Sequence, residues 1–271
     1  TMSNILIDWS TLCAGSTLAF SGLFYYLYQQ EKTKIKKLKA VPKFEPGETL
    51  LKVVRATPYK RLQYVAVEGV VQPEGDLLTS QYVPGCTGVM QKVIVQEHWR
   101  EWDSVARLWR NRSMNQQETN NTVPFSLVAP GAGAGGVAIK VREPREAKGL
   151  HMEQVYKRRR CIPQGVADFA LLGLTGAQPV EQEVREEMLR VGTEMTALGE
   201  VVLEGGRMLR LQPPQDRQQY LLYPNNYKSF LQMHHNVANM WKWLGGFCGI
   251  TGTSLLTWAV CSRLGDTRRG R

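Results

Sequence analysis

A short glycine-rich segment is the first candidate for chemistry in this chain. Residues 131–136 read GAGAGG and match the G-x-G-x-x-G pattern of dinucleotide-binding loops. Such a loop needs a helix directly after it, so that the helix N-terminus can hold the pyrophosphate. Here the pattern runs into Gly136 to Arg142 (GVAIKVR), where Val137, Ile139 and Val141 alternate with other residues as in a strand. We therefore interpret the glycines as a hairpin loop.

Metal-binding and nucleophilic motifs have no better support. The four histidines, His98, His151, His234 and His235, form no H-E-x-x-H motif, and no G-x-S-x-G is present. Glu97, Glu101 and Asp103 could form paired catalytic carboxylates. We interpret them instead as solvated surface charges. Of the five cysteines, Cys86 and Cys161 in the middle region make one disulfide conceivable. The sequence predicts no catalytic residue and no metal site.

The middle of the chain predicts a β-rich α+β domain with few helices, over residues 45–240. Val89 to Trp99 alternates as a strand does, and Met195 to Gln212 reads as a hairpin around Gly205 and Gly206. Helical periodicity predicts helices over Val180 to Val191 and from Tyr227 into the apolar segment that follows.

Two uncharged apolar segments flank this domain and predict two transmembrane helices, residues 11–28 and 244–262. Buried core helices are the alternative. A short segment (1–10) precedes the first span, a basic linker (29–44) follows it, and a basic tail (263–271) follows the second. Much of the net charge of +10 lies beside these spans, which favours lipid headgroups over nucleic acid as the partner. The cations do not decide the topology. The lysines after the first span and the arginines after the second favour opposite orientations in the membrane.

A tryptophan-rich segment is the candidate surface for partner proteins. It contains Glu97, His98, Trp99, Trp102 and Trp109. Exposed tryptophans are favoured interface anchors, although the same residues could fill the domain core or rest against headgroups. In the second span, Gly245 and Gly249 form a G-x-x-x-G match and are candidates for helix packing, against the first span or another protomer. Two sequons, at Asn111 and Asn120, predict glycosylation if this domain enters the secretory pathway.

Three segments carry a resemblance to a known family. They are YVAVEGVVQPEGDLLTSQYVPGCTGVMQKVIVQEHWREWDSVARLWRN (Tyr64 to Asn111), NTVPFSLV (Asn121 to Val128) and EEMLRVGTEMTALGEVVLEGGRMLRLQPP (Glu186 to Pro214). In their order along the chain they resemble the GIDE/BAM-domain (MULAN-like) family of membrane-anchored RING-type E3 ubiquitin ligases. The similarity begins near Gly47 and continues through the second apolar segment.

The resemblance implies a mitochondrial outer-membrane protein, with some relatives peroxisomal, whose central domain faces the intermembrane space and whose termini are cytosolic. In this family a cytosolic RING finger follows the second span and binds zinc through closely spaced Cys and His pairs. This sequence has five cysteines and four histidines without a C-x-x-C pair, so it predicts no RING, no zinc and no transferable catalytic residue.

The sequence leaves three functions open. The first is a truncated or alternatively spliced ligase of this family, acting on ubiquitin or SUMO. Alternatively the chain is a RING-less adaptor or inhibitory paralogue, or the domain is itself a hydrolase or ligand-binding module. The expected partners are the lipid bilayer, protein partners or ubiquitination substrates, and a further copy or a full-length relative. A ubiquitin-conjugating enzyme is expected only with a RING.

Overall fold

The computed structural model describes residues 9–132, 136–163, 165, 170, 173, 174 and 176–269. The chain divides into two compact units, residues 1–41 with 228–271, and residues 42–227. The predicted glycine-rich loop lies partly outside the described residues, since 133–135 are not among them.

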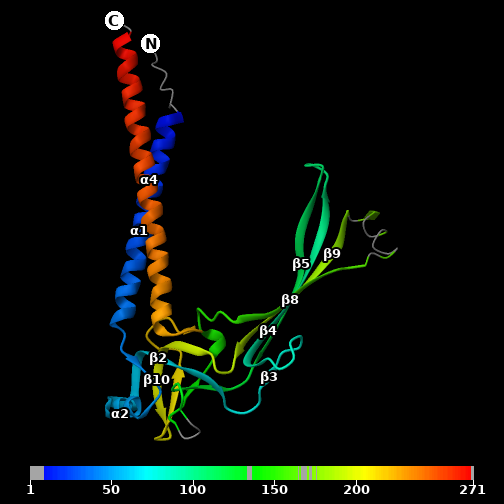
Figure 1. Ribbon diagram of the computed structural model, residues 1–271, viewed down its shortest axis with the longest axis vertical. Coiled ribbons are helices and arrows are strands. Elements are labelled where there is room, and N and C mark those ends of the chain that lie inside the picture. The colour runs from blue at the N-terminus through cyan, green and yellow to red at the C-terminus, as the bar shows by residue number, and fades with distance from the viewer. Residues whose placement is uncertain are drawn as a thin grey trace. The chain divides into compact units, whose positions relative to one another are not determined.

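The first unit is a pair of long helices, α1 (Trp9–Ala40) and α4 (Tyr227–Arg269), which run side by side in Figure 1. The helix predicted to start at Tyr227 is confirmed. Among the described residues, only Tyr227–Ser262 of α4 is long and apolar enough to cross a bilayer. The expectation of two membrane-spanning helices is therefore not confirmed. Residues 11–28 do lie within α1, but serine, threonine and glycine dilute their apolar character.

The second unit is β-rich and contains two sheets. Its elements are β1 (Lys43–Phe44), α2 (Glu48–Ala56), β2 (Arg61–Pro73), β3 (Leu78–Thr79), β4 (Thr87–Asp103), β5 (Leu108–Thr122), β6 (Phe125–Val128), β7 (Ile139–Val141), β8 (Glu153–Cys161), β9 (Ala177–Arg190), β10 (Glu194–Glu204), β11 (Met208–Gln212) and β12 (Leu221–Tyr223), with short 3-10 turns at Pro58–Lys60 and Pro144–Glu146.

Five strands of the first sheet close into a barrel. β2 pairs with β6, β6 with β7, β7 with β11, β11 with β10, and β10 returns to β2. Only the β7–β11 pair of this ring is parallel. This is the strand order of the five-stranded Greek-key barrel called the OB-fold. Short strands β1 and β12 extend the ring beside β2 and β10.

Large apolar side chains fill the barrel. Phe125, Leu127, Ile139, Leu209 and Leu211 are at most 1% exposed. The amphipathic helix α2 adds buried leucine and valine side chains to the same core. The hairpin predicted over Met195 to Gln212 is confirmed as β10 and β11. Its turn depends on glycine, because Gly205 and Gly206 have φ of 59° and 82°.

The second sheet is built from two insertions in the barrel. One, between β2 and β6, contributes β3, β4 and β5, and the other, between β7 and β10, contributes β8 and β9. The strands lie in the order β5-β4-β9-β8, all neighbours antiparallel, with β3 beside the start of β4. The strand predicted over Val89 to Trp99 is confirmed and is longer, as β4.

The helix predicted over Val180 to Val191 is wrong, because these residues form most of β9. The glutamate-rich segment has good local helix propensity, yet it pairs with β4 on one side and β8 on the other. Two flanking partners satisfy the backbone along the strand, and this tertiary pairing outweighs the local preference.

Candidate partner-binding sheet

The five residues of the predicted partner surface lie on one hairpin but not on one face. Glu97, His98, Trp99 and Trp102 are on β4, and Trp109 is on β5. Successive side chains of a strand point to opposite faces, so the segment is divided between the two faces of the sheet. Trp102 and Trp109 are cross-strand partners with ring centroids 5.2 Å apart, and they are 43% and 45% exposed. These two form an exposed aromatic pair near the hairpin turn.

The other residues of the segment are engaged within the sheet. Glu97 accepts hydrogen bonds from Trp99 Nε1 at 3.1 Å and from Asn115 Nδ2 at 2.8 Å. Glu101 and Asp103 each form an ion pair with an arginine of β5 instead. The three carboxylates therefore bind different partners and do not form a catalytic pair.

His98 points to a cluster around a buried carboxylate, Glu183. Glu183 is 2% exposed and lies within ion-pair distance of four cationic or ionisable groups. These are Arg159 Nε at 2.6 Å, Arg185 Nε at 2.9 Å, His98 Nε2 at 3.3 Å and Lys157 Nζ at 3.4 Å. Burial raises the pKa of Glu183, but hydrogen bonds from Arg159, His98 and Lys157 outweigh it and lower the pKa to about 2. Glu183 is therefore ionised at neutral pH.

Sequence reasoning missed Glu183, because its partners come from three strands and its own segment was read as a helix. If residues 180–191 had been predicted as a strand, part of this ion-pair cluster could have been predicted. Arg159 lies directly opposite Glu183 once β8 and β9 are paired.

A second buried carboxylate, Glu186, holds the loop between β3 and β4. It accepts hydrogen bonds from Ser80 Oγ, from the Gln81 amide at 2.9 Å and from Gln91 Nε2 at 2.6 Å. Burial raises its pKa, but these hydrogen bonds lower it further than burial raises it. These contacts join the β3–β4 loop to the sheet, which indicates a structural role for Glu186.

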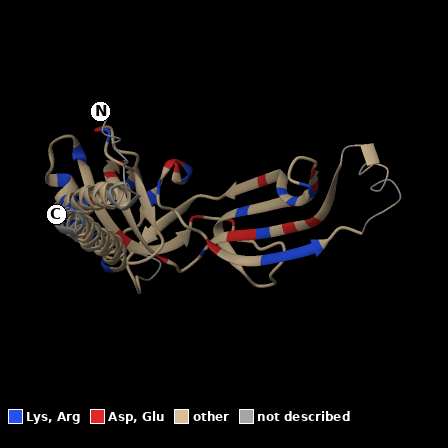
Figure 2. Ribbon diagram, turned by 90° about the horizontal axis from the view of Figure 1, so that it is seen from above, with Lys and Arg blue, Asp and Glu red and all other residues tan. Residues whose placement is uncertain are grey.

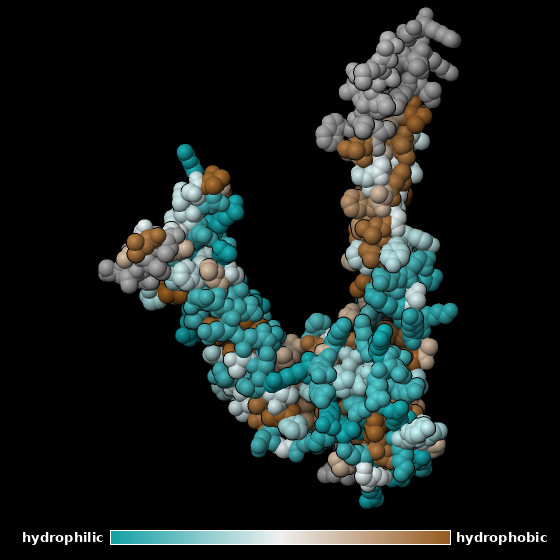
Figure 3. All heavy atoms as spheres, turned by 180° about the vertical axis from the view of Figure 1, so that it is seen from behind, coloured by the Kyte–Doolittle hydropathy of each residue, from teal (hydrophilic) through white to brown (hydrophobic). Residues whose placement is uncertain are grey.

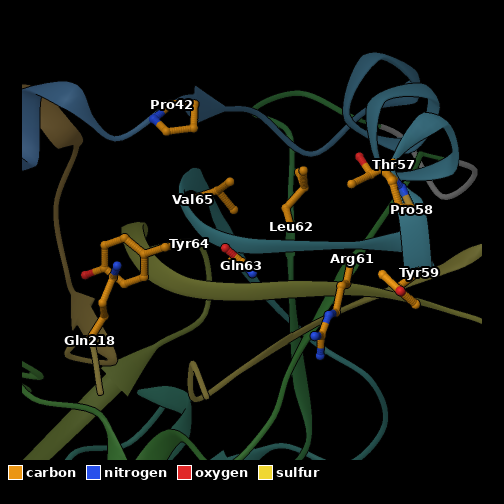
Figure 4. Close-up of a pocket in the computed structure, with 10 residues that line it drawn as sticks. All are labelled: Pro42, Thr57, Pro58, Tyr59, Arg61, Leu62, Gln63, Tyr64, Val65 and Gln218. Atoms are coloured by element: carbon orange, nitrogen blue, oxygen red, sulfur yellow. The ribbon is translucent and has the colours of Figure 1, made fainter. Parts of the chain in front are cut away.

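The barrel carries a cleft of about 520 Å³ on its outer side, beside the first residues of β2. Tyr64 and Gln218 lie at one end of it, and Tyr59 and Arg61 at the other (Figure 4). Burial raises the pKa of Tyr64 to about 12, so its hydroxyl stays protonated. The lining contains no histidine, cysteine or carboxylate, and it offers no general base for catalysis.

No metal-binding group is found among the residues that the structure describes, where three or more His, Cys, Asp or Glu side chains would have to converge. All five cysteines are free, including Cys86 and Cys161. The residues that the structure describes do not supply the converging Cys and His side chains that a zinc-binding RING needs.

In the helix pair, both glycines predicted for helix packing face α1. A Cβ on Gly245 would lie 3.4 Å from Phe24 Cβ, and one on Gly249 would lie 3.2 Å from Ser21 Oγ. Ser21 Oγ also donates a hydrogen bond to the Gly245 carbonyl at 2.8 Å. Gly252, further along α4, makes the closest approach of the three, with a Cβ position 2.8 Å from Thr17 Oγ1. Close approach of the two backbones therefore depends on these small residues.

Comparison with known proteins places these features in a family. Residues 94–257, from within β4 into α4, match the GIDE family, described as E3 ubiquitin ligase. This chain belongs to the GIDE family.

Relatives of this GIDE-family chain come from several animals. The "Mitochondrial ubiquitin ligase activator of nfkb 1-A" of Danio rerio is 36% identical over 91% of this chain and 71% of its own length. The "Mitochondrial ubiquitin ligase activator of NFKB 1" of Homo sapiens is 34% identical over 84% of this chain and 64% of its own. The "Mitochondrial E3 ubiquitin protein ligase 1" of Drosophila melanogaster is 30% identical over 75% and 58%. The chain thus spans roughly two thirds of the length of these relatives. No solved structure matches it.

Proposed function

We propose that this chain is a membrane-anchored protein of the RING-type E3 ubiquitin ligase family, and that its open second sheet binds protein partners. The observation that carries the proposal is the apolar helix pair in a GIDE-family chain. On α4, Trp243, Phe247, Ile250 and Trp258 are 65% to 78% exposed. Exposed apolar side chains in this number are typical of a lipid-facing surface. In Figure 3 the part of these helices next to the grey atoms is largely brown.

The proposal includes two spans, residues 11–28 and 244–262. α1 is less apolar than α4, but some of its polar groups have partners within the helix pair or within α1 itself. Ser21 donates to the Gly245 carbonyl, and Thr17 donates to the Cys13 carbonyl. Internal hydrogen bonding of this kind lets moderately polar helices reside in a bilayer. Both termini would then lie on one side of the membrane, and residues 45–240 on the other.

The proposed location is the mitochondrial outer membrane, with the central domain in the intermembrane space and the termini in the cytosol. Support comes from relatives whose names place them in mitochondria. Peroxisomes are the second candidate. The test is alkaline carbonate extraction of isolated mitochondria followed by protease protection. Residues 45–240 should become digestible only after the outer membrane is ruptured. A gel shift on glycosidase treatment would instead place Asn111 or Asn120 in the secretory pathway.

Ubiquitin transfer by this family needs a RING outside these residues. The 271 residues contain no C-x-x-C spacing, and RING ligases position a charged conjugating enzyme without a covalent intermediate of their own. We propose that these residues supply anchoring and partner binding, and that they bind no zinc and transfer no ubiquitin alone. The purified chain should show no autoubiquitination with a conjugating enzyme. Robust activity would overturn this part of the proposal.

As a RING-less adaptor, the chain would act by pairing with a full-length relative or by occupying that relative's partners. The Trp102–Trp109 pair is the proposed anchor for protein partners, because exposed aromatic residues contribute strongly to interfaces. Substitution of both tryptophans by alanine should weaken capture of crosslinked partners in intact mitochondria. Expression and membrane extraction should stay unchanged. The matched control is Met114→Ala on the same hairpin, which is 40% exposed.

A further inference from the structure

The second sheet has a free edge with an unusual charge. Among the described residues, β8 pairs with β9 alone, so the other side of β8 has no strand beside it. The six residues from Tyr156 to Cys161 pair with β9 without a register shift, so this edge is regular. An edge strand directs unpaired N–H and C=O groups outward, and these can hydrogen-bond to another extended chain.

Four consecutive cations lie on this edge: Lys157, Arg158, Arg159 and Arg160. They appear as the blue length of β8 in Figure 2, beside the mixed red and blue of β9. All four residues are exposed. The set of four is called the β8 basic edge below.

Two of these cations, Lys157 and Arg159, form ion pairs with the buried carboxylate Glu183. Arg159 contacts Glu183 through Nε, as does Arg185 of the neighbouring strand. Both ion pairs form through Nε, at 2.6 Å for Arg159 and 2.9 Å for Arg185. Glu183 carries one negative charge and cannot neutralise Lys157, Arg159 and Arg185 together, so this cluster keeps a net positive charge.

Arg158 and Arg160 point to the opposite face of the sheet. Apart from their backbone pairing with β9, neither side chain makes an ion pair or a hydrogen bond with another residue in the described part of the chain. The β8 basic edge therefore presents unneutralised cations on both faces of one strand. Positive charge lies on either side of the free backbone edge.

Simple protection against aggregation does not explain this pattern. Charged residues on edge strands often serve that purpose. However, β5 is the opposite edge of the same sheet, is longer and more exposed, and has no run of cations. If protection were the cause, β5 would need it more.

We propose that the β8 basic edge binds an extended acidic segment of a partner protein by strand addition. The segment's backbone would pair with β8, and its acidic side chains at alternate positions, which share one face of the added strand, would meet Arg158 and Arg160. Arginine suits this role because its planar fork binds a carboxylate with two parallel hydrogen bonds. This inference rests on the proposed function, for which it names the chemistry of the partner.

The test uses the purified full chain in neutral detergent and fluorescent nine-residue peptides. An alternating Glu-Val peptide should bind, and an alternating Glu-Pro peptide of equal charge should bind at least about tenfold more weakly, because proline cannot donate to a ladder. Equal binding of the two peptides would overturn strand addition. Hydrogen exchange should slow at β8 amides, and no change there would also overturn it.

The variant pair is Arg158→Glu with Arg160→Glu, and the expected loss of Glu-Val binding is at least about tenfold. Arg158→Lys with Arg160→Lys keeps the charge but loses the planar fork and should give an intermediate affinity. The control is Lys52→Glu with Lys60→Glu, which makes the same change of net charge on the exposed surface of the barrel region. A similar loss in the control would show non-specific attraction and would overturn the assignment to β8.

Vesicles of anionic and of neutral phospholipid provide the remaining comparison. If the chain binds anionic vesicles through Arg158 and Arg160 but does not bind the Glu-Val peptide, the edge recognises a membrane and the proposal is wrong. Failure of peptide binding leaves carbonate extraction and protease protection unaffected, so it is distinguishable from failure of the proposed function.

Discussion

The barrel and the second sheet are made of strands from the same stretch of chain, yet they differ in the balance of apolar and charged contacts that stabilises them. The barrel closes on itself and buries apolar side chains such as Phe125 and Leu211. The second sheet is open, and in the part of the chain that the structure describes its edges at β5 and β8 have no further strand beside them. Its interior includes ionised or polar groups, among them Glu183 and Glu186.

This difference assigns the two regions different tasks. Closure removes the edges of the barrel, and the apolar side chains buried there carry no titrating group. A sheet stabilised by ion pairs keeps free edges and responds to its solvent, because every buried charge needs its partner. The barrel therefore fits the role of a scaffold, and the second sheet is the surface on which the proposed partner binding can be tested.

The largest expected effect is in the barrel, with Phe125→Ala. Phe125 is 1% exposed, and truncating a buried phenylalanine costs about 3–5 kcal/mol of unfolding free energy. Hydrogen exchange should accelerate in β10 and β11. Met114→Ala, on the exposed strand β5, should cost less than about 0.5 kcal/mol. If Phe125→Ala accelerates exchange equally in β8 and β9, the two regions unfold as one unit and the contrast fails.

Glu183→Gln should have the next largest effect, and it should be confined to the second sheet. Loss of the charge-assisted hydrogen bonds, with Arg159 and Lys157 left unpaired, costs about 2 kcal/mol. Exchange in β8 and β9 should accelerate while β10 stays unchanged. Glu187→Gln on the same strand makes no such contacts and serves as the control. Faster exchange in β10 would show that the barrel depends on the sheet.

Acid should separate the two regions in the unmodified chain. The folded-state pKa of Glu183 is lowered from 4.5 to about 2, so its stabilisation is complete above about pH 4.5 and is lost as pH falls towards 2. Exchange protection in β8 and β9, corrected for the intrinsic rate, should therefore fall across this range before protection in β10 does. Glu183→Gln should flatten the response. Simultaneous loss in all strands would contradict the separation.

Sequence patterns predicted the elements with a strong local signal. The alternation of β4, the diglycine hairpin of β10 and β11, and the start of α4 at Tyr227 all follow from residues close in the chain. Closure of the barrel could not be read in this way, because it depends on pairing between distant strands such as β7 and β11. The family resemblance was correct, and it rests on residue identities rather than on any physical pattern.

The candidate site was predicted less well, for a related reason. A tryptophan-rich segment was found by composition, but composition does not tell which face of a strand each residue occupies. The Glu183 cluster joins His98, Lys157 and Arg185 from three strands. Misreading β9 as a helix removed the pairing that would have brought these residues together, so one wrong element hid the central charge of the sheet.

The smallest expected effect is that of Gly206→Ala, in the turn between β10 and β11 of the barrel. Gly206 has φ of 82°, and a Cβ added there would meet no atom within 4 Å, so Gly206→Ala adds backbone strain without a clash. The cost is about 1 kcal/mol. Gly75→Ala, with open space and no positive φ, should be neutral by the same measurement of thermal unfolding. Because the ring remains closed by its other pairings, faster exchange should stay at the β10–β11 turn. Opening of β2 as well would show that this one turn controls closure of the barrel.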